Sequence, residues 1–169
     1  MAQEVTHVLK RICILLLLTL LTVPVAALAE PPWPKKPPQI GHLYLKQEYW
    51  EYIKEAAERY NISPYLIQAV CAIESRYDMD ARSVHGRCIG LMQLHKGTAK
   101  IYGVDPYDPR ENIMGGAAVL AKFYHRYNGD IRKVLRKYNS TCTRAYEREV
   151  IKAYQQASSF QTSSSLPDH

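Results

Sequence analysis

Apolar residues recur at helical spacing through almost all of residues 42–157, and this pattern constrains the fold more than any other feature. The first helix of this region should end near Asn61, with an apolar face made of Trp50, Ile53, Ala57 and Tyr60. No alternation of polar and apolar residues is long enough to predict a strand. The fold class is therefore mostly α, and residues 42–157 are enough chain to bury one core.

Helix-capping residues divide this region into segments. Ser63 followed by Pro64 is typical of a helix start and predicts a helix through the sequence YLIQAVCAIES. Asp108 and Pro109 repeat the signal before a second helix, whose buried face should hold Ile113, Ala117, Leu120, Tyr124 and Tyr127. Asp130 should cap a short helix, and RAYEREVIKAY should form the last one.

A pair of glycines, Gly115 and Gly116, lies inside the helix that begins at Pro109. Glycine costs about 1 kcal/mol relative to alanine in a helix interior. We therefore expect a close contact with another helix at this point, which only glycine would permit.

The two ends of the chain differ from the middle. Residues 1–29 are predicted to be a secretory signal peptide, although an uncleaved membrane anchor is the competing interpretation. Residues 30–41 should form a proline-rich linker, and residues 158–169 a disordered tail. An exported protein would act in the periplasm or cell envelope.

The net charge of +6 falls to +5 if residues 1–29 are removed, because Glu4, Lys10 and Arg11 leave together. A basic chain favours an anionic polymer as partner, although a merely soluble basic surface is an equal alternative. Nucleic acid is a poor candidate because the chain has no Lys/Arg cluster. An anionic cell-wall glycan fits an exported protein better.

Three cysteines remain outside the predicted signal peptide: Cys71, Cys88 and Cys142. Their spacing does not resemble a zinc site, so no metal is predicted. In an oxidising compartment they permit one internal disulfide and one leftover thiol, and the sequence alone allows three pairings.

Four short motifs follow one another: AIES at residues 72–75, GLMQL at 90–94, the helix start DPRENI at 108–113, and KYN at 137–139. Together they resemble the lytic transglycosylase branch of the lysozyme-like superfamily, over about residues 47–157. The resemblance implies a lysozyme-like helical domain with a substrate cleft. It also implies cleavage of peptidoglycan glycan strands between N-acetylmuramic acid and N-acetylglucosamine, without a cofactor or a metal.

Glu74 is the candidate catalytic acid. To protonate a glycosidic oxygen near neutral pH, a carboxyl group needs apolar surroundings that keep it protonated, and LIQAVCAI precedes Glu74. The resemblance implies that the muramic acid 6-hydroxyl then attacks internally, with Glu74 returning as the base, to give a 1,6-anhydro product. Asp78 and Asp80 are the alternatives for a second carboxylate, but the family pattern assigns their loop to structure.

The resemblance supplies six candidates for substrate binding: Ser75, Met92, Gln93, Tyr138, Asn139 and Tyr146. Met92 and Gln93 would line the cleft, and the plainer interpretation makes them a core residue and an exposed turn amide. Tyr138 is expected to orient the acid through a hydrogen bond. Ser75 either caps its helix or touches substrate, and Tyr146 is either a cleft wall or core.

The sequence departs from the family pattern in two places. His95 and Lys96 stand where Met-Pro is common, and we interpret His95 as a surface residue beside a turn. The usual Gly-Pro-Gly after Asn139 is missing, and we expect a disulfide between Cys88 and Cys142 in its place, with Cys71 reduced and buried. A Cys71–Cys88 pair would also lie beside Glu74.

Two other functions fit the same motifs. One is a goose-type-like muramidase, which hydrolyses the same bond. The other is a non-catalytic peptidoglycan-binding protein of a secretion apparatus. By family analogy, the partner could be a secretion, conjugation or flagellar machine of the cell envelope.

Overall fold

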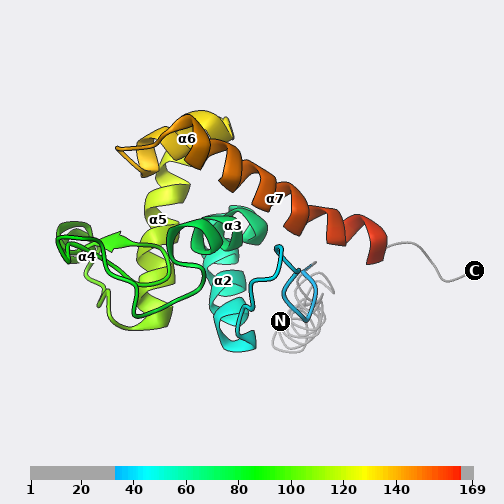
Figure 1. Cartoon of the computed structure of the whole chain (residues 1–169), viewed down its shortest axis with the longest axis horizontal. Helices are drawn as coiled ribbons and strands as arrows, with labels where there is room; N and C mark the ends of the chain where they lie inside the picture. The colour runs from blue at the N-terminus through cyan, green and yellow to red at the C-terminus, as the bar shows by residue number, and fades with distance from the viewer. Residues whose placement is uncertain (1–32, 165–169) are drawn as a thin grey trace, which may run out of the picture. The chain divides into compact units, whose positions relative to one another are not determined.

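A computed structural model describes residues 33–164 and has six helices and one small sheet in this range (Figure 1). The helices are α2 (Gln47–Tyr60), α3 (Pro64–Ser75), α4 (Lys96–Tyr102), α5 (Pro109–Arg126), α6 (Ile131–Tyr138) and α7 (Arg144–Ser164), and the strands are β1 (Cys88–Ile89) and β2 (Leu94–His95). The mostly α fold class is confirmed. The predicted signal peptide lies outside the described residues.

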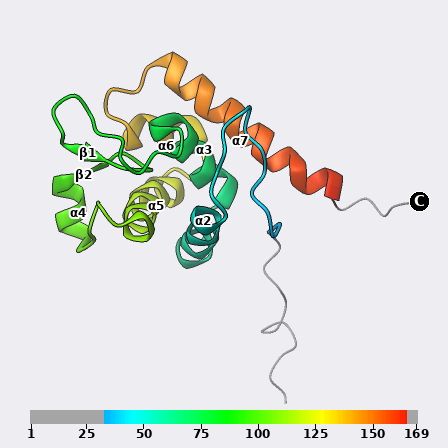
Figure 2. The ribbon, with the colours of Figure 1, turned by 60° about the horizontal axis from the view of Figure 1, so that its bottom comes forward.

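The core is built around α3, which packs against α2, α5 and α7. Nearly every residue of α3 is buried, because this helix runs through the middle of the helical bundle (Figures 1 and 2). The largest fully buried side chains come from α2, α3, α5, α6 and the β1–β2 hairpin; they include Trp50, Leu66, Met92, Ile113 and Leu135. None of the helices within residues 33–164 is long and apolar enough to span a bilayer.

The helix boundaries follow the capping residues that the sequence predicted. Asn61 ends α2 in the left-handed conformation, with φ of 52°. The Asp108 side chain accepts a hydrogen bond from the backbone N–H of Glu111, and the Asp130 side chain accepts one from Lys133. Ser63 begins α3 without a side-chain cap bond, so Pro64 and the buried face of the helix determine that boundary.

The hairpin β1–β2 and the short helix α4 were not predicted. Each strand has only two residues, with Cys88 opposite His95 and Ile89 opposite Leu94, too few for an alternating pattern. Helix α4 has seven residues, and its N-cap is His95, whose Nδ1 accepts from the N–H of Gly97 at 3.1 Å. Histidine is not one of the common N-cap residues.

The two glycines of α5 provide the surface on which the hairpin rests. A Cβ on Gly116 would lie 2.5 Å from Met92 Sδ, and a Cβ on Gly115 would lie 2.8 Å from Leu94 Cδ2. The predicted close approach is confirmed, but the partner is the β1–β2 hairpin and not another helix. These glycines bring the GLMQL motif directly against α5.

The segment predicted as a proline-rich linker, residues 30–41, is in its described part an extended arm that packs against the helices. Pro34 accepts a hydrogen bond from Trp50 Nε1 at 2.9 Å, and Pro38 accepts one from Gln68 Nε2 at 2.7 Å. Trp33 stacks edge-on against Tyr65, at 5.9 Å between ring centroids. The prolines keep the backbone extended, so their carbonyls reach donors on α2 and α3.

The predicted disordered tail, residues 158–169, also needs correction. Helix α7 continues through Ser164, so the first seven of these residues are helical, and residues 165–169 lie outside the described range. Ala157 is fully buried against the core, which extends the packed part of the helix to the edge of the predicted tail.

Candidate active site

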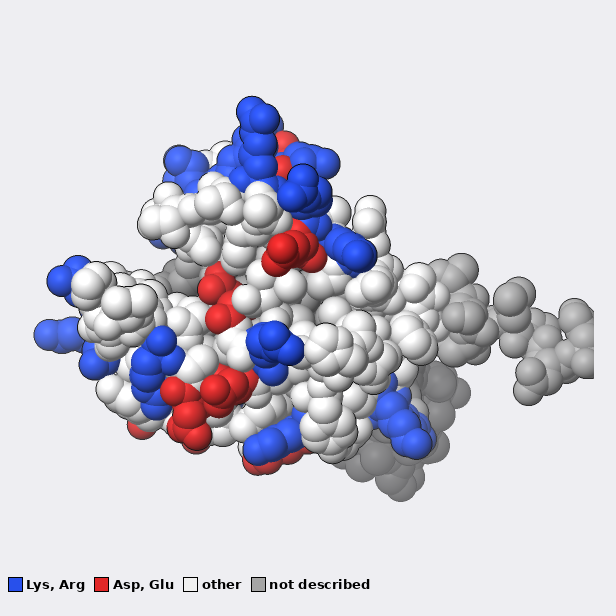
Figure 3. All heavy atoms as spheres, in the orientation of Figure 1, with Lys and Arg blue, Asp and Glu red and all other residues white. Residues whose placement is uncertain are grey.

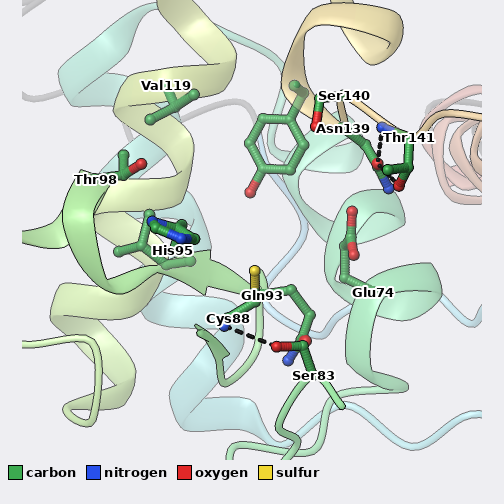
Figure 4. A pocket seen from close by; sticks show the side chains of 12 residues that line it. Glu74, Ser83, Cys88, Gln93, His95, Thr98, Val119, Asn139, Ser140 and Thr141 are labelled. Atoms are coloured by element: carbon green, nitrogen blue, oxygen red, sulfur yellow. Dashed lines mark hydrogen bonds between the residues drawn. The ribbon is translucent and has the colours of Figure 1, made fainter. Parts of the chain in front are cut away.

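A pocket of about 500 Å³ opens between the end of α3, the β1–β2 hairpin and the segment that follows α6 (Figure 4). Glu74 forms one wall, and Gln93 and Cys88 lie below it. The opposite wall comes from His95, Thr98 and Val119. Among the twelve described residues that line this pocket, Glu74 is the only acidic one.

Glu74 is held in its place by a tyrosine from α7. Tyr146 Oη donates a hydrogen bond to Glu74 Oε1 at 2.6 Å. Burial raises the pKa of the Glu74 carboxyl group, while the Tyr146 hydroxyl and the Asn139 amide act in the opposite direction. A carboxyl group with a raised pKa in a pocket has the properties of a general acid.

Ser75 does not line the pocket. Its hydroxyl is buried and donates to the carbonyls of Cys71, at 3.1 Å, and Leu91, at 2.9 Å. Of the two roles expected for Ser75, these bonds support the one at the helix end. Through Leu91 this hydroxyl connects the end of α3 to the GLMQL motif, because a buried hydroxyl needs partners inside the protein.

Met92 is also not part of the pocket lining, since its side chain is fully buried against Gly116. This burial supports the plainer interpretation of Met92 as a core residue. Its backbone, by contrast, is used twice: the N–H donates to Asn112 Oδ1 at 3.0 Å, and the carbonyl accepts from Tyr138 Oη at 2.9 Å.

Asn112 was not recognised as a site residue from the sequence. It is fully buried in α5, and its Nδ2 donates to the carbonyls of Ile89 and Pro106, each at 2.8 Å. Together with the bond from Met92 N–H, its side chain makes three hydrogen bonds to the backbone around the hairpin. The signal was present as the Asn of the DPRENI motif, one turn after the cap of α5.

Gln93 lines the pocket as predicted, in an uncommon left-handed conformation with φ of 45°. Its Nε2 donates to the carbonyls of Ala81, at 3.2 Å, and Gly90, at 3.1 Å. Because both bonds use the amide nitrogen, the side chain is oriented before any ligand binds, and the amide oxygen is the group available to accept from a sugar hydroxyl or N–H.

Tyr138 and Asn139, at the end of α6, also line the pocket, and Asn139 lies close to Glu74 (Figure 4). The hydroxyl of Tyr138 bonds to Met92 and not to Glu74, so the prediction that Tyr138 orients the acid is wrong. Tyr146 makes that bond instead. Asn139 Oδ1 accepts from Thr141 N at 3.0 Å and Thr141 Oγ1 at 2.8 Å, which shapes the loop above Glu74 (Figure 4).

A buried carboxylate holds α6 on α7, so that Tyr138 and Tyr146 keep their relative positions. Glu147 accepts from Arg132 Nη1 at 2.5 Å and from Arg136 Nε at 2.9 Å. These ion pairs lower the pKa of Glu147 despite the opposing effect of burial. Glu147 is therefore a structural carboxylate.

The two alternatives for a second acid lie outside the pocket. Asp78 and Asp80 are exposed, and Asp78 Oδ1 accepts the backbone N–H of Asp80 at 2.8 Å. This arrangement is an Asx turn and matches the structural role expected for their loop. His95 is exposed on the pocket wall, where its Nδ1 caps α4.

The predicted Cys88–Cys142 disulfide is wrong: Cys71, Cys88 and Cys142 are all free thiols. The N–H of Cys142 closes a turn to Asn139, and its Sγ donates to the Thr143 carbonyl at 3.6 Å, whereas Cys88 lines the pocket. Cys71 is reduced and buried, as predicted. Within residues 33–164 no group of three or more metal-binding side chains comes together.

Comparisons with known proteins found sequences similar to this chain. A transglycosylase from Enterobacteria phage PRD1 is 39% identical over 108 residues, which are 63% of this chain and 40% of the relative. A membrane-bound lytic murein transglycosylase F from Desulfosudis oleivorans is 43% identical over 77 residues, which are 45% of this chain and 17% of the relative. The chain thus spans less than half the length of these relatives.

An X-ray structure of an inactive mutant of the lytic transglycosylase Slt from Pseudomonas aeruginosa is 25% identical, with a TM-score of 0.48 over 63% of this chain and 22% of that one. The sequence profile of the transglycosylase SLT domain matches residues 51–161, which is more than half of the chain. This range contains Glu74, Gln93, Tyr138, Asn139 and Tyr146. The chain therefore belongs to the transglycosylase SLT domain family.

Proposed function

We propose that this protein is a peptidoglycan lytic transglycosylase of the bacterial cell envelope. It cleaves the β-1,4 bond between N-acetylmuramic acid and N-acetylglucosamine and leaves a 1,6-anhydromuramic end. The observation that carries this proposal is the pocket with one acidic residue, Glu74, whose pKa burial raises. The names of the relatives, lytic murein transglycosylase and transglycosylase, support the same activity.

In this mechanism Glu74 acts twice. Because Tyr146 donates to Oε1, the carboxyl proton is carried on Oε2. This proton passes to the glycosidic oxygen as the bond from that oxygen to muramic acid C1 breaks. The muramic acid 6-hydroxyl then attacks C1, and its proton returns to the Glu74 carboxylate. The carboxyl group is regenerated and no water is consumed.

A hydrolase that inverts or retains configuration uses two carboxylates, one on each side of the bond. The exposed positions of Asp78 and Asp80, outside the pocket, support a route that needs only one. Mass spectrometry of digested peptidoglycan tests this point. The anhydro end is lighter than a hydrolysed end by one water, and a product with only reducing ends would show a muramidase instead.

A zymogram with embedded cell walls tests the alternative function, that of a non-catalytic peptidoglycan-binding protein. The proposal expects a cleared band for the wild-type chain and none for Glu74→Gln. Binding of cell walls by both proteins without clearing by either would identify a binding protein.

A further inference from the structure

A second groove, of about 440 Å³, lies at the end of α3, where it is lined by Ile73, the residue before Glu74 in the chain. Three segments form it: the turn of the N-terminal arm at Ile40–Leu43, the end of α3 at Ile73 and Arg76, and one face of α7. Figures 1 and 2 show this arm, α3 and α7 side by side. The groove exists only because the proline-rich arm is packed onto the helices.

The groove has an apolar floor and a charged rim. Ile40, Ala72 and Ala153 are buried at its floor. Arg76, Glu149 and Lys152 are exposed at its rim. Figure 3 shows basic and acidic side chains close together on the face of the molecule that Figure 1 presents. In the described part of the chain none of these three rim residues forms an ion pair, and Arg76 Nη2 donates only to His42 Nε2, at 3.3 Å.

On α7 the groove is lined by residues that come after Tyr146 in the chain. Tyr146, which contacts Glu74, is followed at about one-turn intervals by Glu149, Lys152 and Gln156. At about 1.5 Å per residue, the lining residues from Glu149 to Gln156 extend over about 10 Å along the helix. An extended peptide of about three residues has this length.

We propose that this groove, the stem groove, binds the peptide stem that peptidoglycan carries on the lactyl group of muramic acid. The inference rests on the proposed function, because that function brings a muramic acid residue to Glu74. Stem peptides carry free carboxylates, which Arg76 and Lys152 would bind, and an amine, which Glu149 would bind. The apolar floor accommodates the alanine side chains of the stem.

The rim chemistry favours a peptide over a further sugar. N-acetylglucosamine is uncharged, so unpaired charges of both signs would gain no ion pair from it. None of the described residues that line the stem groove is a tyrosine, tryptophan or phenylalanine, so sugar rings find no aromatic face there. A peptide that carries both carboxylates and an amine has a group of opposite charge for each of Arg76, Glu149 and Lys152.

The test compares cleavage of intact, peptide-bearing glycan strands with cleavage of strands from which an amidase has removed the peptides. The double variant Arg76→Gln/Lys152→Gln should lose about fivefold to tenfold in kcat/KM on peptide-bearing strands, mainly through KM, because two exposed contacts are removed. Its activity on peptide-free strands should match that of the wild type. The control Arg126→Gln/Lys100→Gln removes the same charges from exposed positions outside the groove and should change neither activity.

An equal loss on both substrates would overturn the proposal in favour of a sugar site, and no loss on either would overturn it outright. If the wild-type chain cleaves neither substrate, the proposed function fails, and binding then decides about the groove. Calorimetry with the Glu74→Gln protein would measure the affinity for a disaccharide with and without its peptide. A peptide-dependent gain that Arg76→Gln/Lys152→Gln abolishes supports the stem groove; equal affinities refute it.

Discussion

At the scale of single residues, the proposed mechanism depends on the proton affinity of Glu74. Burial raises the pKa of this carboxyl group, and in the proposed mechanism its proton is the reagent that cleaves the bond. Glu74→Gln keeps the shape but has no proton to deliver, so activity should fall by at least about 100-fold, as expected for the loss of a general acid. Release of soluble fragments from cell walls measures it.

The matched control is Asp78→Asn, which keeps an oxygen for the N–H of Asp80 and should stay within several-fold of the wild type. More than a few per cent residual activity in Glu74→Gln, or an equal loss in Asp78→Asn, would contradict the assignment of the acid.

Tyr146 is a positioning residue, and its effect should appear in the pH profile. Its hydrogen bond favours the ionised form of Glu74 and so lowers the pKa of that carboxyl group. Because the proposed reaction needs protonated Glu74, activity should fall as pH rises through this pKa. In Tyr146→Phe the falling limb of kcat/KM should move to higher pH, with about a tenfold lower rate at the optimum. A lower rate without any movement of the limb would indicate a merely structural tyrosine.

The same carboxyl group should make stability depend on pH. Its folded-state pKa is raised above the unfolded value, so the wild-type chain loses stability as pH rises from about 4.5 through the folded pKa. Glu74→Gln cannot ionise and should not show this loss. Thermal unfolding at pH 4 and pH 7 should show a smaller decrease in Tm for Glu74→Gln than for the wild type. An equal decrease in Tm for the two proteins would show that burial does not disfavour the charged form of Glu74.

At the scale of the elements, Asn112 connects α5 to the hairpin that carries Gln93. In Asn112→Ala, the Met92 N–H and the carbonyls of Ile89 and Pro106 lose their partners. Because unpaired buried groups cost about 1–3 kcal/mol each, the free energy of unfolding should fall by about 3 kcal/mol or more. Urea unfolding measures this, and Lys122→Ala, at an exposed site on the same helix, controls for effects of helix propensity.

Asn112→Ala should also lower activity on cell walls under conditions where the variant remains folded. Without the bonds to Asn112 the hairpin is held less firmly, and Gln93, which the hairpin carries into the pocket, loses its fixed position. A stable variant with full activity would show that the hairpin holds its position without Asn112.

At the scale of the whole described unit, the proline-rich arm is part of the fold. A chain that begins at Trp33 keeps the hydrogen bonds from Trp50 and Gln68 to the arm, whereas a chain that begins at Gln39 loses both. Gln68 is fully buried, so its amide then has to be hydrated or left unpaired. The shorter chain should be less stable by about 2–4 kcal/mol, measured by denaturant unfolding. Equal stability of the two chains would show that the arm is only loosely attached.

Local interactions explain which features could be predicted from the sequence. Caps such as Asp108 and Asp130, and the helical spacing of apolar residues, act within one or two turns, and the helices form where these signals occur. Glu74 could be identified because the motifs around it are contiguous in the chain. The hairpin β1–β2 and helix α4 are short, and their stability comes from packing against α5.

The remaining features depend on contacts between distant segments, which only the tertiary structure decides. The sequence predicted Tyr138 as the partner of Glu74, but with α6 and α7 packed around Glu147 it is Tyr146 that donates to Glu74, while Tyr138 donates to Met92. Gly116 of α5 leaves room for the Met92 side chain in the core. The turn after Asn139 positions Cys142, which forms no disulfide with Cys88. The sequence by itself thus determined the helices and the candidate acid, because both follow from neighbouring residues, whereas the side chains that surround Glu74 were decided by packing across the fold.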